Sequence, residues 1–148
     1  MSERTKILVA EDDDKQKQYL EWLLVASGFD VTQVINGIEA LASLEQHGPN
    51  YFNLIVTDLR MPKMSGLAWI NKALETIESF TGPVIFHSTS TQATYWKNAD
   101  MMLQASDLVY KSVTKEIIIP EDKRDAFNVA DSLLVRTIQQ MLANSSTK

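Results

Sequence analysis

The stretch that decides the fold of this 148-residue chain is KILVAEDDD at residues 6–14. A short, mostly apolar run ends at Ala10, and four acids follow it without a break. A run of this length is typical of a buried strand, and acids favour the start of a helix because the helix dipole is positive there. The stretch therefore predicts a strand that ends at a charged edge and leads straight into a helix.

The same unit recurs along the chain. Further strand-like runs lie at residues 29–34, 52–57, 84–86 and 108–110. Apolar residues with helical spacing lie between and after them, at residues 19–26, 38–44, 67–77, 92–104 and 127–141. The strands lack polar alternation, which indicates a parallel sheet buried on both faces by helices. We predict an α/β fold of the flavodoxin-like kind, a (βα)5 doubly wound parallel sheet with strand order 2-1-3-4-5.

We expect residues 1–148 to form one domain, since the length is typical of a single domain and no repeat or linker divides the chain. The expected parts are a core over about 6–111, an extended loop over about 112–124 and a last helix over about 125–143.

Composition excludes several classes of protein. The net charge is −5, so the chain lacks the basic surface that drives non-specific nucleic-acid binding. It has no cysteine, which excludes disulfides, thiolate metal sites and thiol nucleophiles. No apolar run approaches the roughly 20 residues needed to cross a bilayer. We therefore expect a cytoplasmic protein that binds neither nucleic acid directly nor a membrane.

Polar side chains follow four of the predicted strands. They are Glu11, Asp12, Asp58, Ser88, Thr89 and Lys111. With this strand order, the carboxyl ends of the strands bring these groups together at one edge of the sheet. Carboxylates in one site repel each other, and an oxygen-only set of ligands favours Mg²⁺ as the neutralising cation. A metal, a lysine and a hydroxyl around a further carboxylate are the groups that phosphoryl transfer needs. Asp58 could then be the covalent acceptor of the phosphoryl group.

These residues also carry a family resemblance. The segments ILVAEDD at 7–13 and NGIEAL at 36–41, and the loop DLRMPKMSG at 58–66, resemble the receiver domain of two-component response regulators. The strand at 83–89, which ends in hydroxyl residues, and Lys111 also fit that pattern. The nine-residue loop is the most specific element, and the likeness covers about residues 6–111. It implies the flavodoxin-like fold and a signalling role.

The resemblance also assigns a metal site. It implies that Asp12 and Asp58 bind Mg²⁺, that Glu11 holds a metal-bound water, and that Arg60 contributes its backbone carbonyl. The metal would then lie against the carboxylate that accepts the phosphoryl group.

The phosphoryl chemistry follows from the same resemblance. Asp58 would accept the group from a histidine kinase or a histidine phosphotransfer protein. Ser88, with Thr89 as the alternative, would be the hydroxyl that moves toward the phosphoryl group, and Lys111 the lysine that pairs with it. The implied product is an aspartyl phosphate on a signalling switch rather than on an enzyme.

The sequence departs from the family at four positions. Ser112 follows Lys111 where the family usually has proline, and Leu108 stands where a switch aromatic is usual. Thr89 replaces a small residue, and Arg60 is long and cationic. We hypothesise that Thr89 and Arg60 alter the lifetime of the aspartyl phosphate by crowding the attacking water.

The output and two alternatives remain open at this point. By the resemblance, an unknown partner protein would bind the fourth helix and fifth strand, near residues 96–110, and the run at 117–119 could be a further partner surface. One alternative is a scaffold that is not phosphorylated. The other is a Mg²⁺-dependent phosphohydrolase, for which residue 60 lacks the usual second acid. His87 is expected to be a packed strand residue rather than a ligand.

Overall fold

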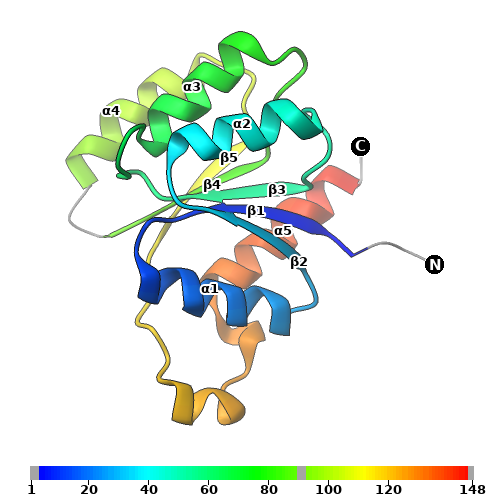
Figure 1. Cartoon of the computed structure of the whole chain (residues 1–148), viewed down its shortest axis with the longest axis vertical. Helices are drawn as coiled ribbons and strands as arrows, with labels where there is room; N and C mark the ends of the chain where they lie inside the picture. Colours follow the sequence, from blue (N-terminus) through cyan, green and yellow to red (C-terminus); the bar gives the residue numbers. More distant parts are fainter. Residues whose placement is uncertain (1–3, 90–92, 147–148) are drawn as a thin grey trace.

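The computed structural model describes residues 4–89 and 93–146, and a parallel sheet lies at its centre (Figure 1). Within these residues the sheet has five strands in the order β2-β1-β3-β4-β5, and each neighbouring pair is parallel. The strands are β1 (Lys6–Ala10), β2 (Asp30–Val34), β3 (Leu54–Thr57), β4 (Val84–Ser88) and β5 (Tyr110–Thr114). The predicted flavodoxin-like topology is confirmed.

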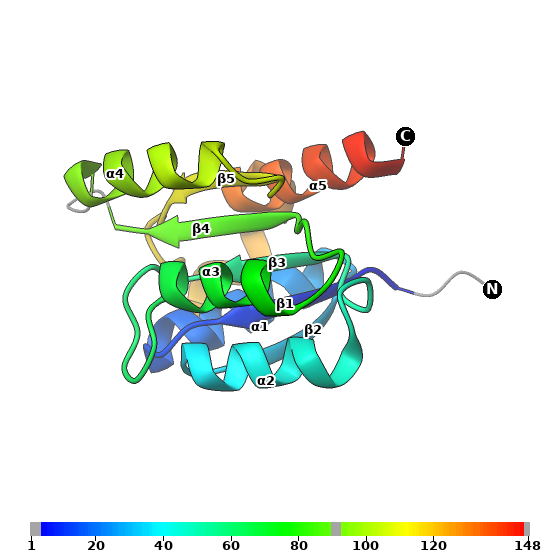
Figure 2. The same ribbon diagram turned by 90° about the horizontal axis from the view of Figure 1, so that it is seen from above.

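Helices cover both faces of the sheet. Figures 1 and 2 show α1 (Asp14–Ala26) and α5 (Leu133–Ser146) on one face, and α2 (Gly37–His47), α3 (Gly66–Thr76) and α4 (Ala93–Gln104) on the other. Two short 3-10 helices, η2 (Glu121–Ala126) and η3 (Val129–Asp131), lie between β5 and α5. Gln92, the expected start of the fourth helix, lies outside the described residues.

The alternation of side chains along β1 explains why its sequence is apolar from Ile7 to Ala10. Ile7 and Val9 pack into the cluster under α1 and α5, whereas Leu8 and Ala10 pack into the cluster under α2, α3 and α4. All four side chains are at most 1% exposed. From Ile7 to Ala10 the strand is covered on both faces and has no solvent-facing position, so polar residues are absent there until the strand ends.

The fifth strand lies further along the chain than the sequence predicted. The expected strand was 108–110, but β5 begins at Tyr110, and Lys111 is an exposed residue at its start. Lys111 therefore does not end the strand, and the prediction was wrong. The reason is that β5 is an edge strand in which Val113 is the one buried residue, so it has no continuous apolar run to reveal it.

The last helix also begins later than predicted. The expected start was near residue 125, but α5 begins at Leu133. The side chain of Asn128 accepts a hydrogen bond from the backbone N–H of Ala130, and the Ser132 hydroxyl accepts one from Val135 N–H. These local bonds favour short turns over a continuing helix, although Phe127 and Ala130 share the helical spacing of the residues that follow.

None of the helices found in residues 4–89 and 93–146 has the length and apolar character needed to span a membrane.

Candidate functional site

Two acids lie side by side because their strands are neighbours. The backbone N–H of Glu11 bonds to Val34 O at 3.1 Å, and that of Asp58 bonds to Ala10 O at 2.9 Å. Both bonds extend the sheet ladder one residue beyond the strands. Asp13, the residue before α1, caps that helix by accepting a hydrogen bond from Gln16 N–H at 2.9 Å. The charged edge predicted from residues 6–14 is therefore confirmed.

The loop after Asp58 is held by close backbone contacts. A Cβ atom at Gly66 would lie 1.9 Å from the backbone oxygen of Asp58, so only glycine fits there. Gly66 N–H also donates to Leu59 O at 2.9 Å. Ser65 begins α3, since its hydroxyl accepts a hydrogen bond from Ala68 N–H at 3.2 Å. The Ser-Gly pair that ends the sequence motif thus folds the loop back against the residue at its start.

A buried hydrogen bond fixes the residue before Asp58. The indole N–H of Trp69 on α3 donates to the Thr57 hydroxyl at 3.0 Å, and that hydroxyl donates to the backbone oxygen of Asp58 at 3.0 Å. Both side chains are fully buried. A buried indole needs a partner for its N–H, so this contact links α3 to the end of β3. The sequence reasoning missed this support.

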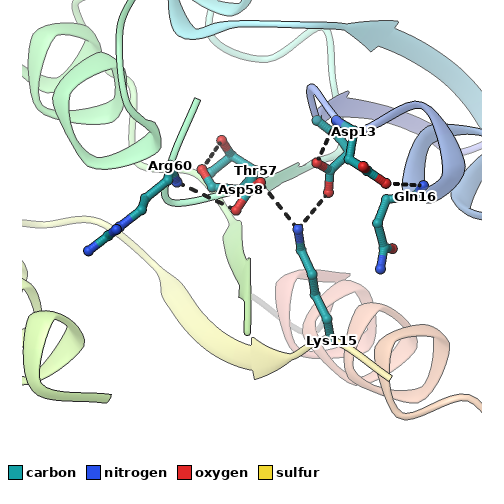
Figure 3. Close-up of polar contacts among 7 residues, drawn as sticks. Asp13, Gln16, Thr57, Asp58, Arg60 and Lys115 are labelled. Atoms are coloured by element: carbon teal, nitrogen blue, oxygen red, sulfur yellow. Dashed lines mark hydrogen bonds and ion pairs between the residues drawn. The ribbon is translucent and has the colours of Figure 1, made fainter. Parts of the chain in front are cut away.

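The lysine of the site is Lys115, which follows β5. Its ammonium Nζ lies 2.9 Å from Glu11 Oε1 and 3.2 Å from Asp58 Oδ2 (Figure 3). The backbone N–H of Lys115 donates to Ser88 O at 2.7 Å, so it continues the ladder between β4 and β5. The structure thus gives Lys115 the position that the sequence analysis assigned to Lys111. A count from the true strand end would have found it.

The charges at the site do not balance. Burial raises the pKa of Glu11 to about 7, with the neighbouring charge of Asp58 as the second cause and Lys115 opposing both. Burial would lower the pKa of Lys115, but its hydrogen bonds and charge interactions with Glu11 and Asp58 raise it overall. Two carboxylates share one ammonium, so the site favours additional positive charge.

The acids fit a divalent cation. One carboxylate oxygen from each of Glu11, Asp12 and Asp58 lies within 4.8 Å of the others. Glu11 and Asp58 are buried, whereas Asp12 is exposed, so the cluster opens to solvent on one side. Hard oxygen ligands with room for waters suit Mg²⁺. The three predicted acids are thus brought together, and the backbone carbonyl of Arg60 stays a prediction.

Arg60 and the residues at the end of β4 frame the site. The backbone N–H of Arg60 is 3.5 Å from Asp58 Oδ1, and Figure 3 shows its guanidinium pointing away from Asp58. Ser88 is buried at the last position of β4, and Thr89 is exposed directly after it. Their predicted roles toward a phosphoryl group stay predictions. His87 is buried among packed residues, as expected.

Comparison with known proteins agrees with this site. The chain matches the family described as the response regulator receiver domain over residues 7–121, and it belongs to that family. It is 34% identical over 102 residues to protein-glutamate methylesterase/protein-glutamine glutaminase 3 of Rhodospirillum rubrum. That match covers 68% of this chain but 25% of the relative. A match to the response regulator receiver protein CpdR of Brucella abortus is 36% identical and covers 47% of this chain and 56% of CpdR.

Solved structures support the fold. A response regulator receiver domain protein from Clostridium thermocellum superposes with a TM-score of 0.73 at 20% identity, with 97% of this chain and 98% of that chain covered. The receiver domain of a sensor histidine kinase from Pseudomonas aeruginosa, solved with a magnesium ion in its active-site cleft, gives 0.71 at 23% identity, with 95% and 99% covered. The chain is therefore a receiver domain of two-component signalling by fold and family.

Because the lysine of the site is Lys115, the departures from the family pattern fall at other residues than the sequence predicted. The position three residues before it, usually aromatic, is Ser112, which pairs with Phe86 in the ladder. The position after it, usually proline, is Glu116. The predicted departures at Leu108 and Ser112 were wrong because they were counted from Lys111. The usual aromatic residue and the usual proline are nevertheless absent at the matching positions around Lys115.

Proposed function

We propose that this receiver domain is a phosphoacceptor switch that takes a phosphoryl group on Asp58 from a histidine kinase or a histidine phosphotransfer protein. The observation that carries the proposal is the Lys115 ammonium, which lies within 3.2 Å of both Glu11 and Asp58 beside the exposed acid Asp12. Family membership supplies the class of donor.

The chemistry needs one nucleophile and several positive charges. An Asp58 carboxylate oxygen forms a bond to phosphorus while the phosphorus–nitrogen bond of the donor histidine breaks, and the bonding electron pair stays on the imidazole nitrogen. Lys115 donates a charge-assisted hydrogen bond to a phosphoryl oxygen as negative charge accumulates there. Mg²⁺, when held by Glu11, Asp12 and Asp58, supplies two further positive charges beside that group.

Transfer of the phosphoryl group would change the balance of contacts at Lys115. The lysine is shared between two carboxylates before transfer, and the phosphoryl oxygens offer it a stronger partner afterwards. The buried hydroxyl of Ser88, joined to Lys115 through the backbone, is the group proposed to move toward the phosphoryl group. These two shifts would bias a two-state element at the β4 and β5 end of the sheet.

The output surface we propose is the face formed by α4 and the start of β5. Met101, Met102 and Val109 are apolar side chains there that are 67%, 58% and 43% exposed. Trp96 is half-buried between Phe86 and Tyr110, with ring centroids 5.2 and 6.1 Å apart, so it links this face to β4 and β5. A protein partner that binds this face is the proposed output. In the further partner surface expected at 117–119, Ile117 is exposed, whereas Ile118 and Ile119 pack on the core.

The experiment is incubation of the whole chain with a small phosphodonor and Mg²⁺, followed by intact mass and a phosphate-release assay. We expect a gain of about 80 Da per chain, the mass of one phosphoryl group, with slow release of phosphate. No gain in mass would favour the non-phosphorylated scaffold. Continuous release of phosphate over many turnovers would favour the phosphohydrolase. Either result would refute the proposed switch.

A further inference from the structure

The residue after Lys115 connects the site to a distant helix. The Glu116 carboxylate oxygen Oε1 accepts hydrogen bonds from the backbone N–H groups of Leu133 and Leu134, the latter at 3.3 Å. These are the first two residues of α5, and Ser132 satisfies the next N–H through its hydroxyl. The first N–H groups of a helix have no partner inside the helix, and its dipole favours a negative charge beside them. Glu116 thus holds the start of α5.

The segment between Glu116 and α5 is attached to α1. The Arg124 guanidinium lies over the rings of Tyr19 and Trp22, 5.5 and 5.2 Å from their centroids, and Phe127 is 6.1 Å from Trp22. Figure 1 shows this segment, with its two 3-10 turns, extending beyond α1 and α5. The chain therefore runs from Lys115 out to α1 and packs there. It then turns back to α5, whose first residues donate hydrogen bonds to Glu116.

Lys115 and Glu116 are coupled through the backbone that joins them. Consecutive Cα atoms are held about 3.8 Å apart, so a displacement of one backbone is felt by the next. Lys115 points to Asp58 and Glu11, and Glu116 points to α5. The two neighbouring side chains therefore join the charge at Asp58 to the first turn of α5.

The interior beside Glu116 leaves room for a small shift. A cavity of about 10 Å³ is lined by Glu116, Ser132 and His87, together with Tyr19 and other residues of α1 and α5. His87 Nδ1 is buried and has no hydrogen-bond partner among the described residues. A hollow of this size holds about one water molecule, so the packing around the Glu116 carboxylate is not complete.

We propose that Glu116 is a positioning residue that transmits the state of Lys115 to the start of α5 and to the segment at residues 117–132. The proposal rests on the proposed phosphoacceptor function. When the phosphoryl group draws Lys115 toward itself, Glu116 moves from the Leu133 and Leu134 N–H groups and the first turn of α5 loosens. The signal then reaches a surface that contains Ile117, which is 87% exposed, in addition to the α4 face.

The first test needs no phosphorylation. Backbone amide exchange of Leu133 and Leu134 is measured by NMR in the wild type and in Lys115→Met, each with Glu116 intact or replaced by alanine. We expect Glu116→Ala to speed the exchange about tenfold by removing the charged acceptor. Lys115→Met should change the exchange by roughly threefold, but only when Glu116 is present. Lys111→Met, at an exposed site in β5, is the control and should change nothing.

The second test adds the small phosphodonor and Mg²⁺. Phosphorylated wild type should show faster exchange at Leu133 and Leu134 than the unphosphorylated protein. Phosphorylation of Glu116→Ala should cause no further change. Glu116→Gln keeps an acceptor oxygen and should retain part of the response, which separates positioning from loss of folding. Unchanged exchange in fully labelled wild type, or an equal response in Glu116→Ala, would overturn the inference. Absence of labelling in the wild type would refute the proposed function, and the first test would then decide the role of Glu116.

Discussion

The two halves of the site differ in how they are built. The acidic half, from β1 and β3, comes from central strands whose residues are buried on both faces. The lysine half comes from β5, an edge strand with one buried residue, and from a segment of 3-10 turns. The strands β1 and β3 each pair with a neighbour on both sides, whereas β5, which Lys115 follows, pairs with β4 at the edge of the sheet. We infer that the acidic half is the rigid part of the site and the lysine half the part that moves.

The largest expected effect separates the two lysines. Lys115→Gln should slow phosphorylation of Asp58 by roughly 10²-fold, because it removes a preorganised cation from the transferring group. Lys111→Gln is the matched control, since Lys111 is exposed at the start of β5 and should leave the rate unchanged. Rates of mass gain with a small phosphodonor measure both. Equal losses in the two variants would remove the distinction between these positions.

The acidic half is tested by its metal. Asp12→Asn should raise the Mg²⁺ concentration needed for half the maximal rate of phosphorylation at least about tenfold, because one carboxylate of the cluster is lost. Asp14→Asn, in the first turn of α1 and outside that cluster, is the control. The measurement is the Mg²⁺ concentration that gives half the maximal labelling rate, and removal of the metal with a chelator should stop labelling in every variant. A normal Mg²⁺ requirement in Asp12→Asn would show that this acid is not a ligand.

His87, on the strand β4 beside β5, makes the stability of the protein depend on pH. Burial, followed by the charge of Lys115, lowers the pKa of His87 from 6.5 to about 3. Between those values the unfolded chain binds a proton at this residue that the folded chain does not bind. Its contribution to stability is therefore complete above pH 6.5 and is lost as the pH falls toward 3.

The variant His87→Gln isolates this contribution. Between about pH 7.5 and pH 5, the wild type should lose about 2 kcal/mol more of its free energy of unfolding than His87→Gln does. Urea unfolding at the two pH values measures the difference. Other groups titrate in both proteins alike, so identical losses would mean that His87 is protonated in the folded chain.

The smallest expected effect concerns the lifetime of the aspartyl phosphate. Thr89→Ala should speed loss of the phosphoryl group roughly threefold by opening the site to water. Arg60→Asn should change it less, because the guanidinium points away from Asp58. Autodephosphorylation rates of the labelled proteins measure both. Unchanged rates in both variants would refute the hypothesis that these residues shield the phosphoryl group.

The sequence predicted the acidic half well and the lysine half poorly, for physical reasons. A strand such as β1 shows its burial as an unbroken apolar run, and Gly66 is required by a backbone contact, so both leave a clear pattern. The exposed residues of β5 leave none, and the apolar pattern instead predicts a strand at Leu108 and Val109, which lie before it. The contact from Trp69 to Thr57 joins residues 12 positions apart and depends on tertiary packing.

The central claim is that Asp58 is the acceptor, and locating the phosphoryl group tests it most directly. The labelled chain is digested, and the peptide that carries the additional mass of about 80 Da is fragmented to the residue. The account predicts the mass on Asp58 in the wild type and no stable label in Asp58→Asn. Label on another residue, or undiminished labelling of Asp58→Asn, would contradict it.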